Sequence, residues 1–310
     1  MILAGAKGIE PLIEVLETSV IPFNYAPRVY LLYYNRPMIS NSIKRIIKIS
    51  LEEDIGSGDW TTIWLIPEKQ TSQARIVAKD KGIIAGLEVA KEIFGPSVKF
   101  TELVKDGAKV QKNQTVAVVE GPTRLILSCE RTVLNFMQRM SGIASQTYEF
   151  VKLTQATKAV ILDTRKTMPG LRELDKWAVR LGGAQNHRFG LYDMILVKDN
   201  HIQAVGGISK AMQVLTQNNN NKLEVEIEVD NLEQLKEAIN AGAKKILLDN
   251  FSLENIKKAV NLNNSRAVLE VSGGVTLENV ANIAKTGVDY ISVGSLTHSV
   301  KAMDLSIEIN

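Results

Sequence analysis

The sequence is poor in the residues that make covalent cross-links and Cys/His metal sites. Among its 310 residues are one cysteine, Cys129, and three histidines. One cysteine excludes an internal disulfide, and with three scattered histidines it excludes a zinc site built from Cys and His ligands. Cys129 lies in an apolar run, as a small core residue does in a reducing compartment. We therefore predict a cytoplasmic protein without a structural zinc ion.

Long apolar runs and a strong net charge are also missing. No apolar stretch reaches the roughly 18 residues that a membrane-spanning helix needs. The first residues lack the basic start and long apolar core of a signal peptide. The net charge of +3 is too small to favour a nucleic-acid partner. We expect neither a membrane nor a nucleic acid as partner, so the basic residues matter by where they cluster.

Residues 1–37 differ in composition from the rest of the chain. They hold four of the seven tyrosines, and Pro22 and Pro27 would break any long helix. We interpret them as an N-terminal extension that is non-native or disordered, with Met38 as the natural beginning. The alternative interpretation is an ordered arm that packs on a neighbouring subunit.

Residues 38–154 show the mixed pattern of an α+β domain. Apolar residues at helical spacing predict helices, and short β-prone runs separated by turn residues predict strands. The predicted elements are a short helix near 43–51 capped by Ser42, a turn-rich loop over 53–62, short strands between 73 and 120, a helix at 87–94 and a long helical stretch over 123–154. We expect them to form a sandwich-like α+β domain.

From residue 155 to 295, short apolar runs alternate with helical patterns. The predicted strands span 160–164, 194–198, 224–229, 245–249, 267–271 and 290–293, and the predicted helices about 171–182, 208–217, 232–241, 253–261 and 277–286. Such alternation is typical of a parallel sheet. A doubly wound sheet would carry a Gly-rich phosphate turn after its first strand, where this chain has Thr164-Arg165-Lys166. We therefore predict an α/β barrel, open or short of eight strands.

Cationic side chains gather after the first two strands of this predicted barrel. Arg165 and Lys166 follow the first strand, Lys198 ends the second, and His187 and Arg188 lie between them. The carboxyl ends of the strands form the face on which α/β barrels keep their chemistry. Five positive or potentially positive groups would repel one another there, so the sequence predicts a polyanionic ligand. Arginine can hold a carboxylate or phosphate through two parallel hydrogen bonds, which lysine cannot.

The later strands end in acids and then in glycines. Glu228 and Asp249 could accept hydrogen bonds from sugar hydroxyls, or hold Mg²⁺ with waters and a substrate phosphate. The alternative is that they only pair with the cations opposite. Ser272-Gly273-Gly274 and Gly294 follow the last two strands, where many barrels bind phosphate through backbone N–H groups. These turns predict a phosphate site.

Several longer segments carry a family resemblance. They are EDIGSGDWTT (53–62), ERTVLNFMQRMSGIAS (130–145), DTRKTMPGLRELDKWAVRLGGAQNHRFGLYDMILVKDNHI (163–202), EVEIEVDN (224–231), ILLDNF (246–251), LEVSGGVT (269–276) and ISVGSLTHS (291–299). On these residues the chain resembles the quinolinate phosphoribosyltransferase family over about 38–310. The resemblance implies an open TIM-like α/β barrel whose last residues, 296–310, return to the N-terminal domain.

The resemblance also implies a reaction and its partners. Members transfer phosphoribosyl from phosphoribosyl pyrophosphate to quinolinate with decarboxylation, giving nicotinate mononucleotide, pyrophosphate and CO₂ in de novo NAD synthesis. Mg²⁺ is required, and the enzyme is a pentosyltransferase. The family forms homodimers or hexamers in which the equivalent of Arg131 reaches into the partner's site. By itself, Arg131 would more often be a surface salt-bridge residue.

The resemblance implies a role for each site residue. The quinolinate carboxylates should be surrounded by Arg131, Arg165, His187, Arg188 and Lys198. The ribose, pyrophosphate and Mg²⁺ should be handled by Lys166, Glu228 and Asp249, which are the catalytic candidates, with Glu228 and Asp249 holding the metal directly or through water. Thr164 belongs to the substrate-binding set, and the 5′-phosphate should be held by Ser272, Gly273, Gly274 and Gly294.

Three alternatives remain open from the sequence. A phosphoribosyltransferase for a monoacid such as nicotinate would not need so many arginines and lysines. A relative of the family attached to metal-uptake genes would act on an unknown substrate. A non-catalytic sugar-phosphate sensor on the same barrel is expected to lack acidic strand ends, whereas Glu228 and Asp249 are present.

Overall fold

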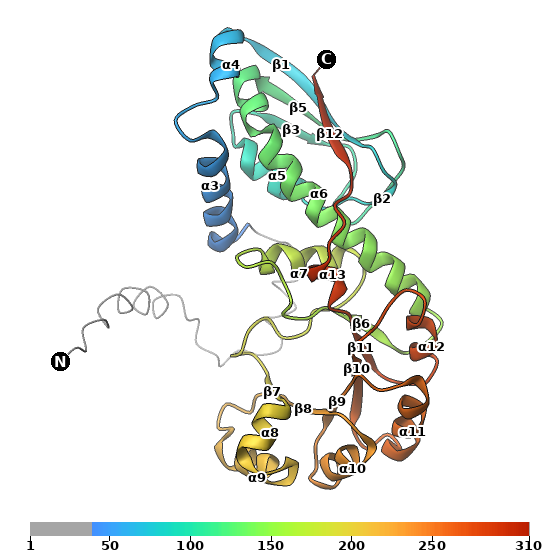
Figure 1. Cartoon of the computed structure of the whole chain (residues 1–310). Coiled ribbons are helices and arrows are strands. Elements are labelled where there is room, and N and C mark those ends of the chain that lie inside the picture. The colour runs from blue at the N-terminus through green and yellow to red at the C-terminus, as the bar shows by residue number, and fades with distance from the viewer. Residues whose placement is uncertain (1–38, 310) are drawn as a thin grey trace, which may run out of the picture. The chain divides into compact units, whose positions relative to one another are not determined.

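The computed structural model describes residues 39–309, and from residue 41 onward these form one compact unit (Figure 1). The interpretation of residues 1–37 as an extension lies outside the described residues. None of the helices described is long and apolar enough to cross a membrane. Two main sheets organise the described chain.

The N-terminal sheet is antiparallel and mixed with helices. Its region comprises α3 (Asn41–Ile55), α4 (Trp60–Leu65), β1 (Thr71–Ala78), β2 (Gly82–Ile83), α5 (Leu87–Phe94), β3 (Lys99–Glu102), β4 (Lys109–Val110), β5 (Gln114–Pro122) and α6 (Thr123–Thr154). The strand order is β12-β1-β5-β3, where β12 (Leu305–Ile309) comes from the end of the chain. Short strands β2 and β4 pair separately. The predicted helices at 87–94 and 123–154 are confirmed.

The predicted loop over 53–62 is wrong at both ends. Helix α3 continues to Ile55, and α4 begins at Trp60, so only four residues between them form a turn. Asp59 caps α4, because its Oδ1 accepts a hydrogen bond from the Thr62 N–H at 3.0 Å. A capping carboxylate satisfies a helical N–H that would otherwise lack a partner. Ser42 lies inside α3, which begins at Asn41, so it does not have the predicted capping position.

The C-terminal sheet is wholly parallel. Its strands are β6 (Val160–Leu162), β7 (Ile195–Val197), β8 (Val225–Val229), β9 (Lys245–Asp249), β10 (Val268–Ser272) and β11 (Tyr290–Ser292), and its helices are α7 (Arg172–Leu181), α8 (Asp199–Val205), α9 (Ile208–Asn218), α10 (Leu232–Asn240), α11 (Leu253–Asn263), α12 (Val280–Ala284) and α13 (Ser295–His298). All six predicted strands are confirmed to within two residues. Helix α8 was not predicted, and α12 is shorter than the predicted 277–286.

The six parallel strands form an open barrel. Their order is β6-β11-β10-β9-β8-β7, so β6 and β7 are the two edges and are not paired with each other. The segment between these edges carries one bridge, from Leu162 to Gln185. The open TIM-like α/β barrel is therefore confirmed. The loop that holds His187 and Arg188 runs along this opening, which places both residues beside the ends of β6 and β7.

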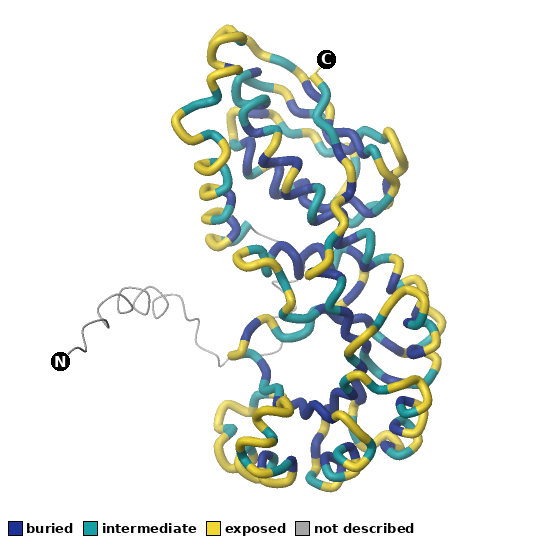
Figure 2. The backbone as a smooth tube through the Cα atoms, in the orientation of Figure 1, coloured by how far each residue is buried: buried dark blue, intermediate teal, exposed yellow. Residues whose placement is uncertain are grey.

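Helix α6 and the last strand connect the two sheets. Helix α6 contacts β1, β5 and β12 on one side and β6, α7 and α12 on the other. At Gly142 the backbone of Lys301 comes so close that an added Cβ would lie 2.2 Å from its carbonyl oxygen. Strand β12 then pairs antiparallel with β1, from Ala74↔Ile309 to Ala78↔Leu305. Figure 2 shows the buried residues along α6 and the strands, which form the apolar core.

Candidate active site

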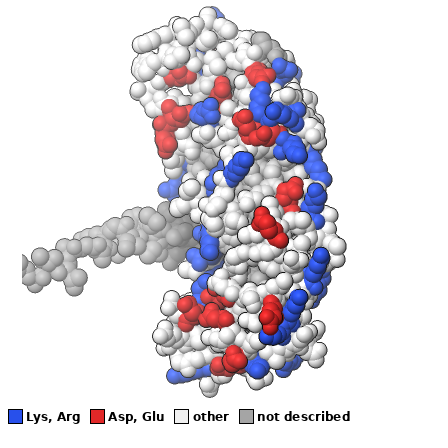
Figure 3. All heavy atoms as spheres, turned by 45° about the vertical axis from the view of Figure 1, so that its right-hand side comes forward, with Lys and Arg blue, Asp and Glu red and all other residues white. Residues whose placement is uncertain are grey.

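The predicted site residues lie at the carboxyl ends of the parallel strands. Residues 163–166 follow β6 and Lys198 follows β7. Glu228 and Asp249 lie at the carboxyl ends of β8 and β9. Ser272 ends β10, Gly273 and Gly274 follow it, and Gly294 follows β11. Because all six strands are parallel, these ends share one face of the barrel. The outer face seen in Figure 3 carries interspersed basic and acidic side chains instead of a patch of one sign.

A buried carboxylate, Asp163, holds the first two cationic loops together. It accepts hydrogen bonds from Lys176 Nζ at 2.6 Å, from Asn186 Nδ2 at 2.7 Å and from the His187 N–H at 2.8 Å. Lys176 Nζ also donates to the His187 carbonyl at 2.9 Å. Burial raises the pKa of Asp163 despite the nearby ammonium, and burial lowers the pKa of Lys176. This ion pair therefore fixes where the chain turns at residues 186–188.

Arg172 makes a second connection between the same loops. Its guanidinium donates to Thr167 Oγ1 at 3.1 Å and to the Phe189 carbonyl at 3.0 Å, with a longer contact of 3.4 Å to the Arg165 carbonyl. One side chain thus ties the loop after β6 to the loop before β7. Since both loops carry a predicted substrate-binding arginine, Arg172 helps to set the spacing of Arg165 and Arg188.

Arg165 and Arg188 form the centre of the cation cluster. Arg188 donates to the Met194 carbonyl at 3.1 Å, whereas Arg165 Nε is buried without a hydrogen-bond partner among residues 39–309. Burial, and then the charge of Arg165, lower the pKa of Arg188. A buried donor without an acceptor is costly, and two neighbouring guanidinium ions repel. An anionic ligand would relieve both costs.

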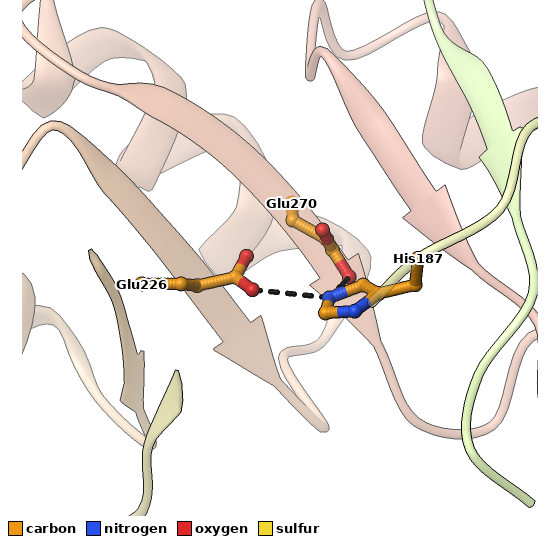
Figure 4. Close-up of side chains that lie close together, drawn as sticks. All are labelled: His187, Glu226 and Glu270. Atoms are coloured by element: carbon orange, nitrogen blue, oxygen red, sulfur yellow. Dashed lines mark hydrogen bonds and ion pairs between the residues drawn. The ribbon is translucent and has the colours of Figure 1, made fainter. Parts of the chain in front are cut away.

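His187 lies beneath these arginines in the barrel interior, with its side chain 7% exposed. Its Nε2 lies 3.1 Å from Glu226 Oε2 and 3.3 Å from Glu270 Oε1. Figure 4 shows the two carboxylates pointing toward the ring. Burial lowers the pKa of His187, but the hydrogen bonds and charges of the two carboxylates outweigh it and raise the pKa to about 9. On the other side of the ring, Nδ1 accepts the Arg188 N–H at 2.8 Å. A proton on Nδ1 would repel that N–H, so this contact opposes the rise and, in the neutral ring, keeps the single proton on Nε2.

The acids at the ends of β8 and β9 have different partners. Glu228 Oε2 accepts from Lys198 Nζ at 2.9 Å, with the Lys198 side chain 48% exposed and that of Glu228 10%. Asp249 accepts from Ser272 Oγ at 2.6 Å and from Asn250 Nδ2 at 2.7 Å. Glu228 thus pairs with a predicted cation, as one interpretation of the sequence had it. Both groups still offer carboxylate oxygens, the ligand type that Mg²⁺ prefers.

The glycines after β10 depend on backbone conformation. Gly273 has φ +88°, and a Cβ added there would lie 2.0 Å from Asn250 Oδ1. Gly274 has φ +61° with open space around its Cβ position. Only glycine adopts such angles without strain. The turn therefore leaves its backbone uncovered beside Asn250, as a phosphate-binding turn requires.

The remaining predicted residues occupy both ends of this face. Lys166 is exposed and lies beside Gly294, whose added Cβ would be 3.2 Å from Lys166 Cδ. Thr164 Oγ1 accepts the Lys166 N–H at 3.0 Å. Arg131 is different: it is exposed on α6, and its side chain has no hydrogen bond or ion pair with any other described residue. The contacts within one chain therefore do not tie Arg131 to the strand-end cluster.

Sequence reasoning missed the buried charges that support the site. Asp163, Lys176, Glu226, Lys245 and Glu270 are at most 8% exposed. A charge inside an apolar strand was the available signal, since Glu270 interrupts the otherwise apolar β10 and Glu226 shares a strand face with Glu228. Their partners come from other strands, so the pattern alone could not pair them. His201 lies in the first turn of α8, where its Nδ1 accepts the Lys198 N–H at 3.0 Å.

The fold and the site define a class of protein. An open α/β barrel that collects arginines, lysines, acids and phosphate-type turns on its strand ends is an enzyme scaffold for substrates with several negative charges. Residues 59–141 match the N-terminal domain of the quinolinate phosphoribosyl transferase family, and residues 143–308 match its C-terminal domain. The chain belongs to the quinolinate phosphoribosyltransferase family.

Individual relatives agree with this assignment. The mitochondrial decarboxylating quinolinate phosphoribosyltransferase 2b of Nicotiana tabacum is 45% identical over 290 residues, covering 86% of this chain and 82% of that protein. The probable carboxylating nicotinate-nucleotide pyrophosphorylase of Bacillus subtilis is 44% identical over 270 residues, covering 86% and 93%. The crystal structure of NadC from Streptococcus pyogenes has a TM-score of 0.85 at 37% identity, covering 89% of this chain and 99% of that one.

Proposed function

We propose that the residues at the strand ends carry out phosphoribosyl transfer to a pyridine dicarboxylate. The chain transfers the phosphoribosyl group of phosphoribosyl pyrophosphate to quinolinate and releases pyrophosphate and CO₂, giving nicotinate mononucleotide for NAD synthesis. The observation that carries the assignment of residues is the cation cluster, in which buried Arg165 Nε has no acceptor within the described chain. A dicarboxylate supplies the missing acceptor.

Quinolinate is held by Arg165, Arg188 and Lys198. The two guanidinium groups suit planar carboxylates through paired hydrogen bonds. Lys198 stands at the opening of the site, paired with Glu228 at 2.9 Å. His187 belongs to this set by position, although both of its ring nitrogens are engaged within the protein. The negative charge of the substrate offsets the repulsion among these cations.

Phosphoribosyl pyrophosphate occupies the acidic and glycine-rich half of the face. The backbone of Ser272, Gly273, Gly274 and Gly294 binds the 5′-phosphate, and Lys166 and Thr164 lie toward the pyrophosphate. Asp249 and Glu228 accept hydrogen bonds from the ribose and would hold Mg²⁺, directly or through water, together with phosphate oxygens. When bound, the ion neutralises charge on the leaving pyrophosphate. Both carboxylates are part of oxygen-rich surroundings that fit such a hard cation.

The two halves of the face must stabilise developing charges of opposite sign. Departure of pyrophosphate leaves a ribose with oxocarbenium character, and Glu228 or Asp249 stabilises the positive charge that grows there. Decarboxylation then leaves negative charge on the pyridine ring carbon. The pair of electrons stays on that carbon, where the positive charge of the adjacent quaternary ring nitrogen stabilises it most, and the neighbouring Arg and Lys side chains add to that stabilisation. Acids near the ribose and cations near the ring match this sequence of events.

The direct experiment is to incubate the purified protein with quinolinate, phosphoribosyl pyrophosphate and Mg²⁺ and to measure nicotinate mononucleotide. A parallel reaction with nicotinate tests whether the second carboxylate is needed. Product from quinolinate alone supports the dicarboxylate site. Product from nicotinate but not quinolinate would mean that the cations serve the phosphates, and no product from either would favour the divergent-relative or sensor interpretation. A reaction in EDTA, restored by Mg²⁺, tests the metal requirement.

Arg131 acts in the site of a second copy of the chain, in a homodimer or hexamer. Its exposure on α6, without an ion pair in its own described chain, supports this arrangement. Exposed apolar side chains on α4, among them Trp60 at 52% and Trp64 at 77%, offer a contact surface nearby. Helix α4 packs on α6, the helix that carries Arg131. We place the enzyme in the cytoplasm, where the buried thiol of Cys129 stays reduced.

Subunit mixing tests the shared site. Arg131→Ala and Lys198→Ala oligomers should each be inactive. After dissociation and mixing, a hybrid pair contains one site with neither substitution, so activity should return to roughly a quarter of wild type if subunits reassort at random. Mixed samples that remain inactive, although hybrids are present by mass spectrometry, would place Arg131 outside the partner's site.

A further inference from the structure

Four ionisable side chains form a continuous network inside the barrel below the cation cluster. Glu226 on β8 and Glu270 on β10 approach His187 Nε2 from two strands (Figure 4). Lys245 on β9 lies on their other side, with Nζ 3.7 Å from Glu226 Oε1 and 3.4 Å from Glu270 Oε2. Ser292 of β11 also donates to Glu270 Oε1. Both glutamates are fully buried and Lys245 is 8% exposed, so water does not solvate this network.

The network is an ionic support and not a metal site. His187, Glu226 and Glu270 bring three possible ligand atoms within 4.8 Å of one another. The ammonium group of Lys245, however, already supplies the cation between the two carboxylates. A divalent ion would be repelled by that ammonium. Without the ammonium, two ionised carboxylates would be strongly unfavourable in the interior.

The upper end of the network reaches the substrate site through a backbone contact. His187 Nε2 faces the carboxylates, and Nδ1 accepts the Arg188 N–H at 2.8 Å. The ring therefore has no nitrogen left for a substrate in this arrangement. The position of the ring is nevertheless fixed. Its Nε2 edge is held by the carboxylates in the barrel interior, and its Nδ1 edge holds the backbone N–H of Arg188. The guanidinium of Arg188 is oriented in turn by its bond to the Met194 carbonyl.

We propose that His187 is a positioning residue that connects the buried Lys245–Glu226–Glu270 network to the backbone of Arg188, so that these four residues set the orientation of the arginine that binds quinolinate. This inference rests on the proposed role of Arg188. Glu270 and Lys245 act without touching substrate. The proposal assigns a purpose to charges whose burial would otherwise only reduce stability.

The ionic surroundings of the ring are consistent with this role. Burial opposes ionisation of Glu270, but the hydrogen bond and charge of His187, with Lys245, lower the pKa of Glu270 to about 2. Burial raises the pKa of Glu226. The other charged groups near the ring are Asp163, which accepts the His187 N–H, Lys176, which donates to its carbonyl, and Arg188 itself. Both carboxylates thus face the Nε2–H bond, Glu226 at 3.1 Å and Glu270 at 3.3 Å.

The first test compares Michaelis constants in variants that remove the support without reaching the substrate. Glu270→Gln keeps the shape of the side chain and removes its charge. We expect KM for quinolinate to rise roughly tenfold or more, the effect of losing a charged hydrogen bond, with KM for phosphoribosyl pyrophosphate unchanged. Lys245→Met should act in the same direction. Asp106→Asn, which alters a buried carboxylate that caps α5, is the control and should leave both constants unchanged.

A double-mutant comparison shows whether Glu270 acts through Arg188. In an Arg188→Lys background the side chain can no longer form the paired contact, so adding Glu270→Gln should change KM for quinolinate much less than in wild type. Equal effects in the two backgrounds would overturn the proposal. So would a Glu270→Gln enzyme that is folded and has an unchanged KM for quinolinate.

A spectroscopic readout separates this inference from the proposed function. The chain has only three histidines, so ¹⁵N imidazole signals can be assigned by replacing His187 with Asn. Above its pKa of about 9, the neutral His187 ring should carry its proton on Nε2 and leave Nδ1 unprotonated and hydrogen-bonded, and Glu270→Gln should alter this pattern while His201 and His298 keep theirs. This result needs no turnover. A ring that exchanges freely between tautomers in wild type would contradict the inference even if the enzyme is active, and an inactive wild type would contradict only the proposed function.

Discussion

The ion pairs of the two sheets differ in how far they are buried. On the N-terminal sheet, Lys99 pairs with Glu120, and both side chains are more than half exposed. In the barrel, the Lys176 and Asp163 side chains pair at 2.6 Å with exposures of 2% and 0%. Exposed pairs contribute little to stability, whereas buried pairs carry a desolvation cost that only good geometry offsets. Burial of charge therefore marks where the chain needs side chains held in one arrangement.

Breaking a buried pair should produce the largest effect. Lys176→Met leaves Asp163 buried without its cation, and we expect a loss of about 3–5 kcal/mol in the free energy of unfolding, measured by urea denaturation. Adding Asp163→Asn should recover part of that loss, because the uncompensated charge is removed. Lys99→Met on the N-terminal sheet is the matched control and should leave the midpoint unchanged. Equal losses for the two lysines would remove the contrast between the sheets.

Arg188→Ala should affect catalysis instead of stability. The variant loses the proposed bidentate contact with quinolinate, and we expect kcat/KM to fall by roughly a hundredfold or more while the melting temperature stays near that of wild type. Steady-state rates and a thermal melt on the same sample measure both. An unchanged kcat/KM would remove Arg188 from the site, and unfolding would show that its role is structural.

The glycine turn offers a pair of neighbouring substitutions. Gly273→Ala introduces a Cβ 2.0 Å from Asn250 Oδ1 at φ +88°, whereas Gly274→Ala at φ +61° meets open space. Both strain the backbone by about 1–2 kcal/mol, but only the first must displace Asn250. We expect KM for phosphoribosyl pyrophosphate to rise clearly more for Gly273→Ala. A larger rise for Gly274→Ala would mean that the neighbouring asparagine does not shape the turn.

The smallest effect is a pH dependence of stability outside the barrel. Burial raises the pKa of Asp106 to about 6, although it accepts the Leu87 N–H at the start of α5. A raised pKa means that the folded state binds the proton more tightly, so this stabilisation is lost as pH rises through about 6. Asp106→Asn should therefore be more stable than wild type by about 1–2 kcal/mol at pH 8. The extra stability of the variant should shrink between pH 6 and pH 4. A stability difference that stays constant with pH would show that the raised pKa of Asp106 is not its cause.

Much of the fold could be predicted from the sequence because buried parallel strands are short apolar runs with clear ends. The six strands of the barrel follow that rule, and helices α5 and α6 were predictable from apolar residues at helical spacing. Helices α4 and α8 were missed because each begins in a polar segment, at Asp59 and Lys198, whose capping bonds decide the structure. Strand β12 could be expected only from the family resemblance. Its pairing with β1 joins residues more than 200 positions apart, which no local pattern reveals.

The candidate site was predictable at its surface but not in its interior. Arg165 and Lys198 follow strands and Glu228 and Asp249 lie at strand ends, so their convergence follows from a parallel sheet. The contact of His187 with Glu270 depends instead on which strands become neighbours and how far the barrel opens. Likewise, the proposed role of Arg131 in a second subunit is not encoded in any contact within the described chain.

The most direct measurement is a crystal structure of the protein with quinolinate bound. The account predicts that the two carboxylates lie within hydrogen-bond distance of the Arg165 and Arg188 guanidinium groups, that Arg165 Nε gains an acceptor, and that His187 keeps its contacts with Glu226, Glu270 and the Arg188 N–H. Quinolinate bound away from the two arginines, with the arginines contacting only phosphate, would contradict it.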